Sequence, residues 1–310
     1  MRFTTTTILS LTAALAGCGD DTTQAPDAPI PQPEQLVLPG NAFYPESLTA
    51  HADGTLYVGS LGTGQVVAYA NGDESPRTII AGHGVTNVAG VAVHDDTLWL
   101  CSVDVTFQRP TELRSFSLDG VPGITATLAA NQFCNDIELD TAGNVYATDS
   151  FSGAILRLRP GATTLETWTQ DARFAASMQG AFGLDGIAYD GTGALLVNTL
   201  DRGKLFRVPI TASGAAGAIT EITVTPPLAS PDGMRALDAD TLLVVEGPGR
   251  LTQVDIAGNV ATATPLVSGL DMPTSVVVAR GSAWISEGQL GRLFTGAQPI
   301  GPFLVKRVDL

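Results

Sequence analysis

Basic residues are scarce in this chain: 16 Lys and Arg stand against 31 Asp and Glu over 310 residues, a formal net charge of −15. Such an acidic chain repels phosphate backbones, so we expect no nucleic-acid partner. Long apolar runs are missing too, and none reaches the ~20 residues that a membrane-spanning helix needs. Only 15% of the residues are charged and 44% are hydrophobic, which excludes a disordered protein.

Glycine and proline are plentiful, with 34 and 19 residues. Together with frequent Thr and Val, they favour many short strands joined by tight turns, and therefore an all-β fold.

The first eighteen residues have the pattern of an export signal. A short basic start is followed by an apolar, threonine-rich stretch over residues 3–15, which ends in Leu15-Ala16-Gly17-Cys18. This tetrapeptide resembles the lipobox of bacterial lipoproteins, and an ordinary secretory signal is the alternative. The resemblance implies a signal peptide over residues 1–17 and membrane attachment through lipidated Cys18 only. The chain would lie on the periplasmic side of the membrane or at the cell surface, and Gly19 favours the outer membrane.

Residues 18–35 are rich in Pro and Asp and have little to bury, so we expect a disordered tether before a folded domain over residues 36–310. That domain contains two cysteines, Cys101 and Cys134. An oxidising compartment allows them to pair, but their spacing does not show whether they lie close together. Both redox states stay open at this stage.

Six repeats of one frame cover residues 45–310. Each begins at a position that we call x, with an apolar residue two positions later and a three-residue apolar run centred ten or eleven positions later. Turn signals such as Ala52-Asp53-Gly54 lie between them, and two further strands precede the next x. The x residues are Glu46, Ala89, Asn135, Asp185, Asp232 and Thr274.

Four antiparallel strands in each repeat, arranged radially, predict a six-bladed β-propeller over residues 36–310. The segment Leu36-Val37-Leu38 would close the ring against the last blade. We expect a monomer.

Four of the x residues carry oxygen ligands. The first strand of each propeller blade lines the central channel, so these side chains would form a ring around one mouth. Oxygen ligands from separate strands suit Ca²⁺ best, with Mn²⁺, Mg²⁺ or Zn²⁺ as alternatives. Asp185-Gly186 and Asp232-Gly233 could instead be simple turns, but no glycine follows the other two residues. The predicted ligands are Glu46, Asn135, Asp185 and Asp232.

The same residues carry a family resemblance. Glu46, Asn135-Asp136 and Pro231-Asp232-Gly233 resemble motifs of the regucalcin (senescence marker protein)/gluconolactonase family of six-bladed propellers, which includes enzymes like luciferin-regenerating enzyme. The resemblance implies that Glu46, Asn135 and Asp232 bind a divalent metal. The family usually has an asparagine as the fourth ligand, where this chain has Asp185, and the extra negative charge opposes anionic substrates.

The family implies a metal-dependent hydrolase of lactones or esters. The metal would polarise the carbonyl of a small-molecule substrate, and Asp232 would act as base or nucleophile. Ala89 stands where paraoxonase-type enzymes have a catalytic histidine, so a mechanism of that kind is not expected. A non-enzymatic propeller that binds a ligand or a protein, with a purely structural cation, remains the alternative. Candidate substrate-pocket residues are His83, Asp136, Arg109 and Phe182.

Overall fold

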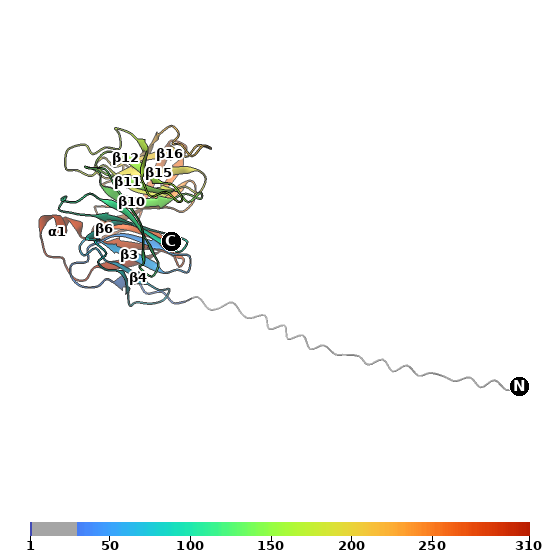
Figure 1. Cartoon of the computed structure of the whole chain (residues 1–310), viewed down its shortest axis with the longest axis vertical. Helices are drawn as coiled ribbons and strands as arrows, with labels where there is room; N and C mark the ends of the chain where they lie inside the picture. The colour runs from blue at the N-terminus through green and yellow to red at the C-terminus, as the bar shows by residue number, and fades with distance from the viewer. Residues whose placement is uncertain (2–29) are drawn as a thin grey trace. The chain divides into compact units, whose positions relative to one another are not determined.

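The computed structural model describes Met1 and residues 30–310, so the predicted signal peptide after Met1, Cys18 and most of the predicted tether lie outside the described residues. The chain divides into the units Met1–Ile30 and Pro31–Leu310. The described part of the second unit is nearly all β, with one short helix, α1 (Leu290–Thr295) (Figure 1). The prediction of an all-β fold is confirmed. Within the described residues, no helix has the length and apolar character needed to cross a membrane.

The strands repeat in groups of four. The first strands of the groups are β2 (Pro45–Ala50), β6 (Asn87–His94), β10 (Cys134–Leu139), β14 (Leu184–Tyr189), β18 (Pro231–Ala236) and β22 (Pro273–Ala279). The second strands are β3 (Leu56–Ser60), β7 (Thr97–Val103), β11 (Val145–Asp149), β15 (Ala194–Thr199), β19 (Thr241–Glu246) and β23 (Ser282–Glu287). The third strands are β4 (Val66–Tyr69), β8 (Glu112–Ser117), β12 (Ala154–Leu158), β16 (Lys204–Pro209), β20 (Arg250–Ala257) and β24 (Leu304–Asp309). The outer strands are β5 (Arg77–Ile80), β9 (Pro122–Thr127), β13 (Glu166–Gln170), β17 (Thr220–Thr225), β21 (Val260–Ser268) and β1 (Gln35–Val37).

The strands of the described residues form four sheets of four strands and one sheet of eight. In the eight-stranded sheet, two antiparallel groups, β14–β17 and β18–β21, are joined because β17 pairs parallel with β21, with Thr223 opposite Val260. This pairing satisfies backbone groups that two edge strands would otherwise leave open. The sheets alone therefore do not confirm the predicted count of six blades, since the fourth and fifth repeats share one hydrogen-bonded ladder.

The first strands of the repeats form a closed ring. They contact one another in chain order, and β22 contacts β2. At the outer edge of the last group, β1 pairs antiparallel with β24, with Leu36 opposite Val305. This confirms the prediction that the segment around Leu36 closes the ring.

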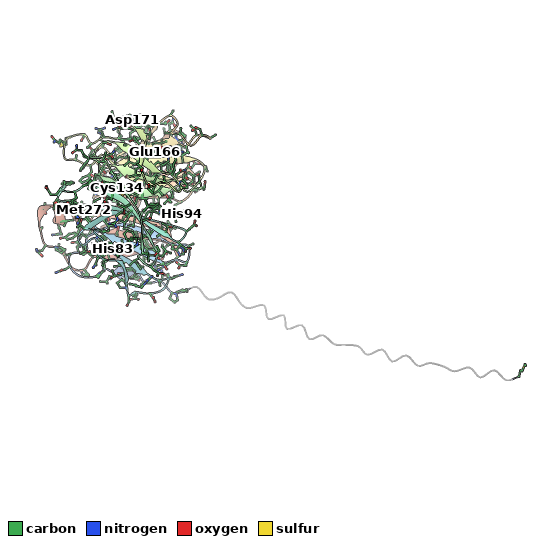
Figure 2. All side chains as sticks on the ribbon, viewed as in Figure 1. His83, His94, Cys134, Glu166, Asp171 and Met272 are labelled. Atoms are coloured by element: carbon green, nitrogen blue, oxygen red, sulfur yellow. A yellow bond between two sulfur atoms is a disulfide. The ribbon has the colours of Figure 1, made fainter. Side chains whose placement is uncertain are left out.

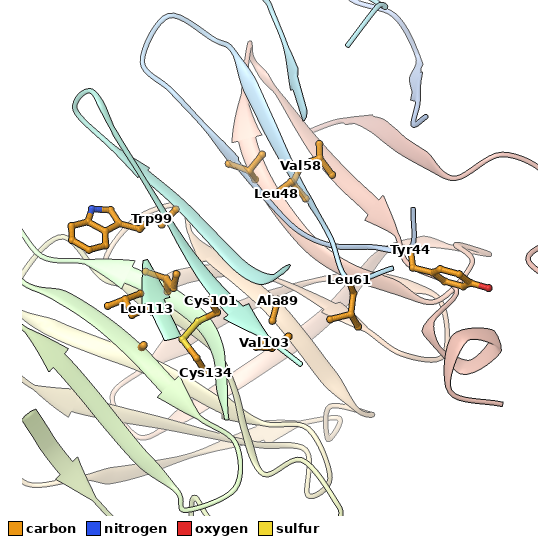
Figure 3. Packing of buried hydrophobic residues seen from close by; sticks show 14 of the residues in the cluster. Tyr44, Leu48, Val58, Leu61, Ala89, Trp99, Cys101, Val103, Leu113 and Cys134 are labelled. Carbon is orange, nitrogen blue, oxygen red and sulfur yellow. A yellow bond between two sulfur atoms is a disulfide. The ribbon is translucent and has the colours of Figure 1, made fainter. Parts of the chain in front are cut away.

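The core lies between the sheets and follows the repeat frame. Every apolar residue two positions after x is buried: Leu48, Val91, Ile137, Ile187, Met234 and Val276. A disulfide joins Cys101 on β7 to Cys134 on β10, with the two Cα atoms 5.4 Å apart (Figure 3). The two cysteines are therefore paired, and the bond links the second repeat to the third.

Candidate functional site

Each of the six first strands has a β-bulge at or beside position x. The register with the second strand shifts between Pro45 and Ser47, Val88 and Val91, Cys134 and Ile137, Leu184 and Ile187, Pro231 and Met234, and Pro273 and Ser275. A bulge leaves a residue outside the regular ladder and redirects its side chain. In every repeat, the x side chain therefore does not follow the usual alternation of side chains between the two faces of a strand.

The structure brings the four predicted metal ligands to one cavity of about 490 Å³. Glu46, Asn135, Asp185 and Asp232 come from β2, β10, β14 and β18 and all line this cavity. Ala89, the x residue of the second repeat, lines it as well. Side chains separated by up to 186 positions in the chain thus face one space.

The glycines after x allow neighbouring first strands to approach closely. A Cβ on Gly186 would lie 2.4 Å from the carbonyl oxygen of Asp232, and one on Gly90 would lie 2.3 Å from that of Asn135. Both Asp185-Gly186 and Asp232-Gly233 lie inside strands, β14 and β18. The alternative that these pairs merely form turns is therefore wrong.

The three carboxyl groups of the cavity repel one another. Burial, and next the charge of Asp185, raise the pKa of Glu46 well above its usual range. Burial and the charge of Asp232 raise the pKa of Asp185, and burial and the charge of Glu46 raise the pKa of Asp232. Among the described residues that line this cavity, none is Lys, Arg or His. When ionised, these three groups face no basic residue in the described part of the cavity lining, and the opposing charge that acts on Glu46 is that of Arg235, outside that lining.

Asp136 lines a small space together with Glu46, Asp185 and Asp232, and its charge adds to the effects that raise the pKa of each of them. Its Oδ2 atom lies 3.3 Å from Nη1 of Arg235 and accepts a hydrogen bond from the backbone nitrogen of Ile187. Its Oδ1 atom accepts one from the nitrogen of Ile137. The carboxylate thus ties β10 to β14 and β18, next to the cavity of about 490 Å³ and not in its lining.

The side-chain amide of Asn135 is held in a fixed orientation. Its nitrogen donates to Oγ of Ser150 at 3.0 Å, and Ser150 in turn donates to the carbonyl oxygen of Leu184 at 2.7 Å. Because the amide nitrogen is used in a hydrogen bond to Ser150, the amide oxygen is the atom of Asn135 that is free to act as a ligand.

His83 and Arg109 lie elsewhere. Both line a second cavity of about 330 Å³, together with Thr86 and Arg114. Nη2 of Arg109 donates to Oγ1 of Thr86, and Nη1 of Arg114 donates to the carbonyl oxygen of His83. Figure 2 shows His83 and Met272, a residue of the first cavity, at separate places in the molecule. Of the four predicted pocket residues, Phe182 lines the cavity of about 490 Å³, and Asp136 lies beside the same carboxylates in a smaller space.

The walls of that cavity include residues that the sequence did not indicate. Leu61 appears in Figure 3, and helix α1 contributes Leu290 and Phe294. The i, i+4 spacing of Leu290 and Phe294 is a helical pattern, but it extends over too few residues to stand out.

By ligand type, the donor set suits a hard divalent cation. Two buried carboxylates, the half-buried carboxylate of Asp232 and one oriented amide supply only oxygen, the ligand type that Ca²⁺ and Mg²⁺ take, and a cation would remove the repulsion between the carboxylates. No group of three or more His, Cys, Asp or Glu side chains in the described ranges is arranged so that it could hold a metal ion. Metal binding therefore stays a prediction.

No family model matches the chain. No curated protein resembles it in sequence. Solved structures resemble it in fold. A luciferin-regenerating enzyme is 13% identical with a TM-score of 0.66, covering 87% of this chain and 92% of that one. A gluconolactonase from Xanthomonas campestris is 16% identical with a TM-score of 0.65, covering 88% and 89%.

A virginiamycin B lyase from Staphylococcus aureus is 14% identical with a TM-score of 0.59, covering 88% of this chain and 98% of that chain. These proteins are β-propellers, and the class to which the fold of this chain belongs is therefore the β-propeller. The predicted resemblance to the gluconolactonase group is confirmed at the level of the fold.

Proposed function

We propose that the chain is an exported, lipid-anchored, metal-dependent hydrolase of the lactone or ester type, built on a six-bladed propeller. In this interpretation the eight-stranded sheet is the fourth and fifth blades joined through β17 and β21. The observation that carries the proposal is the convergence of four oxygen-bearing side chains, from four first strands, on one cavity without a basic lining residue. Such a site attracts a cation and leaves space beside it for a substrate.

Glu46, Asn135, Asp185 and Asp232 would hold the cation, with Ca²⁺ as the first choice. When bound, the cation would polarise a substrate carbonyl as a Lewis acid. The bulges fix the four side chains on rigid strands, and the apolar walls limit the access of bulk water. Asp232 would accept the proton of the water molecule that attacks the carbonyl carbon.

Two kinds of support bear on this proposal. The repeat frame places a glutamate, an asparagine and an aspartate at positions typical of the gluconolactonase group, and solved structures with the same fold include a gluconolactonase. The same fold also occurs in a virginiamycin B lyase, so the fold alone does not select the reaction.

The test is an assay of the purified full chain against lactones and aryl esters, after chelation and after addition of Ca²⁺, Mn²⁺, Mg²⁺ or Zn²⁺. We expect turnover that needs the metal. Asp232→Asn and Glu46→Gln should each lower kcat/KM by a factor of about 100 or more. Asp119→Asn serves as the control, because the side chain of Asp119 is 84% exposed and lies outside the cavity.

The absence of metal-dependent turnover in the whole panel would refute the proposal. If Asp232→Asn then lowers only the thermal stability, a binding propeller with a structural cation is the better description.

A further inference from the structure

The cavity has a polar floor and an apolar rim. The floor consists of side chains on first strands, and Asp185 is only 3% exposed. The rim comes from segments next to the strands and from α1, where Phe294 is 57% exposed. The rim side chains are mainly Leu61, Phe133, Phe182, Met272, Leu290 and Phe294.

The rim is stabilised by packing between aromatic rings. The rings of Phe133 and Phe182 meet edge to face with centroids 5.1 Å apart, and Phe151 lies 5.4 Å from Phe182. Phe107 extends this cluster, with its ring 6.2 Å from that of Phe133. A preformed aromatic wall of this kind binds apolar groups without a large ordering cost.

This rim is a poor partner for hydroxyl groups. Beyond the four floor residues, Ser230 is the polar side chain that lines the cavity among the residues described by the structure. A polyhydroxylated ring would leave several hydroxyl groups against Phe and Leu side chains, where each unpaired group costs binding energy. An alkyl or aryl tail would instead gain about fourfold in affinity for each methylene group that it buries.

We propose that the cavity takes neutral lactones or esters with an apolar tail, and not sugar lactones or anionic substrates. The carbonyl faces the carboxylate floor, and the tail lies along the rim, with Phe294 as a specificity-determining residue. This inference rests on the proposed function, because it names the substrate class of the same site.

The test measures binding of three lactams to the full chain by calorimetry, with saturating Ca²⁺ and after chelation. Lactams keep the carbonyl and the six-membered ring but resist hydrolysis, so binding is read without turnover. The probes are piperidin-2-one, 6-pentylpiperidin-2-one and D-glucono-δ-lactam. We expect the pentyl compound to bind at least roughly tenfold tighter than either of the others.

Phe294→Ser should weaken binding of the pentyl compound by about fivefold and leave piperidin-2-one unchanged. Ile300→Ser is the matched control, because Ile300 is 61% exposed, lies close to α1 in the chain and does not line the cavity. Both substitutions are at exposed side chains, and an unchanged melting temperature verifies that each variant is folded.

Equal or tighter binding of D-glucono-δ-lactam would overturn the inference, as would a failure of all three lactams to bind. An unchanged affinity of Phe294→Ser for the pentyl compound would overturn the role of that residue. Turnover of δ-decalactone is measured in parallel. If the pentyl lactam binds most tightly but δ-decalactone is not hydrolysed, the proposed hydrolase function is refuted and the inferred ligand class stands. If δ-decalactone is hydrolysed but D-glucono-δ-lactam binds most tightly, only the present inference is refuted.

Discussion

At the scale of single residues, the residue directly after x determines how neighbouring first strands contact each other. Position x+1 is glycine where the neighbouring first strand must come close, as at Gly186. It is a hydrogen-bonding residue elsewhere: Ser47 accepts from the nitrogen of Val91, and Asp136 accepts from that of Ile187. One position thus sets the spacing between neighbouring first strands, while the preceding position supplies most of the polar side chains that line the cavity.

Gly186→Ala tests this spacing. The new Cβ would lie 2.4 Å from the carbonyl oxygen of Asp232, so β14 and β18 must separate. We expect a loss of about 2–3 kcal/mol in the free energy of unfolding, measured with denaturant. Gly291→Ala is the control, because its Cβ would meet only the sulfur of Met272 at 3.5 Å and it lies within α1. If Gly186→Ala lowers the free energy of unfolding by no more than Gly291→Ala does, the close approach of β14 to β18 at Gly186 is contradicted.

The buried carboxyl groups predict how the stability of the metal-free protein depends on pH. Because the pKa values of Glu46, Asp185 and Asp232 are raised in the folded state, the folded protein keeps these protons to higher pH than the unfolded chain. The unfolded state then binds fewer protons, so stability falls as pH rises above about 4. The melting temperature of the chelated protein should decrease from pH 4 towards pH 8.

Asp185→Asn should make this decrease smaller, and Asp119→Asn should leave it unchanged. Added Ca²⁺ should also reduce the decrease, since it favours the ionised carboxylates. A chelated protein whose melting temperature is flat or rises over this range would show that the three groups do not share one uncompensated site.

At the scale of strands and helices, much of the arrangement was predictable. Alternation and turn residues located the first two strands of each repeat, because side chains on those strands are buried in a regular pattern. The bulges and the β17–β21 pairing were not predictable, since they depend on contacts between repeats. The contribution of Phe294 on α1 to the cavity wall was not predictable either. Nor was the position of Arg109 in the second cavity, because its hydrogen-bond partner Thr86 lies 23 positions away in the chain.

The link between β7 and β10 gives a prediction at this scale. Replacing both Cys101 and Cys134 by alanine opens a loop of 33 residues in the unfolded chain. On a chain-entropy basis we expect a loss of about 4 kcal/mol in stability. Denaturant unfolding measures it, and reduction of the natural protein should give a similar shift. A double variant as stable as the natural chain would show that the bond constrains nothing in the unfolded state.

At the scale of the whole molecule, the predicted lipid anchor is open to a direct test. In a bacterial host, the natural chain should fractionate with membranes, and Cys18→Ser should appear in the soluble exported fraction. Labelling with a radioactive fatty acid should be lost in the same variant. Cys134→Ala is the control for loss of a cysteine, and we expect it to keep the label. A labelled Cys18→Ser protein would exclude this cysteine as the acylated residue.

The pairing of β1 with β24 has a mechanical consequence. β1 is only three residues long, and it is the first strand of the described chain after the predicted tether. Just before it, Gln32 donates a hydrogen bond to Asn71 and accepts one from Arg280. With Cys18 anchored, any tension on the anchor is applied first to these contacts and then to the ladder that closes the ring. Once the contacts of Gln32 break, the pairing of β1 with β24 would therefore be the next part of the domain to open under force.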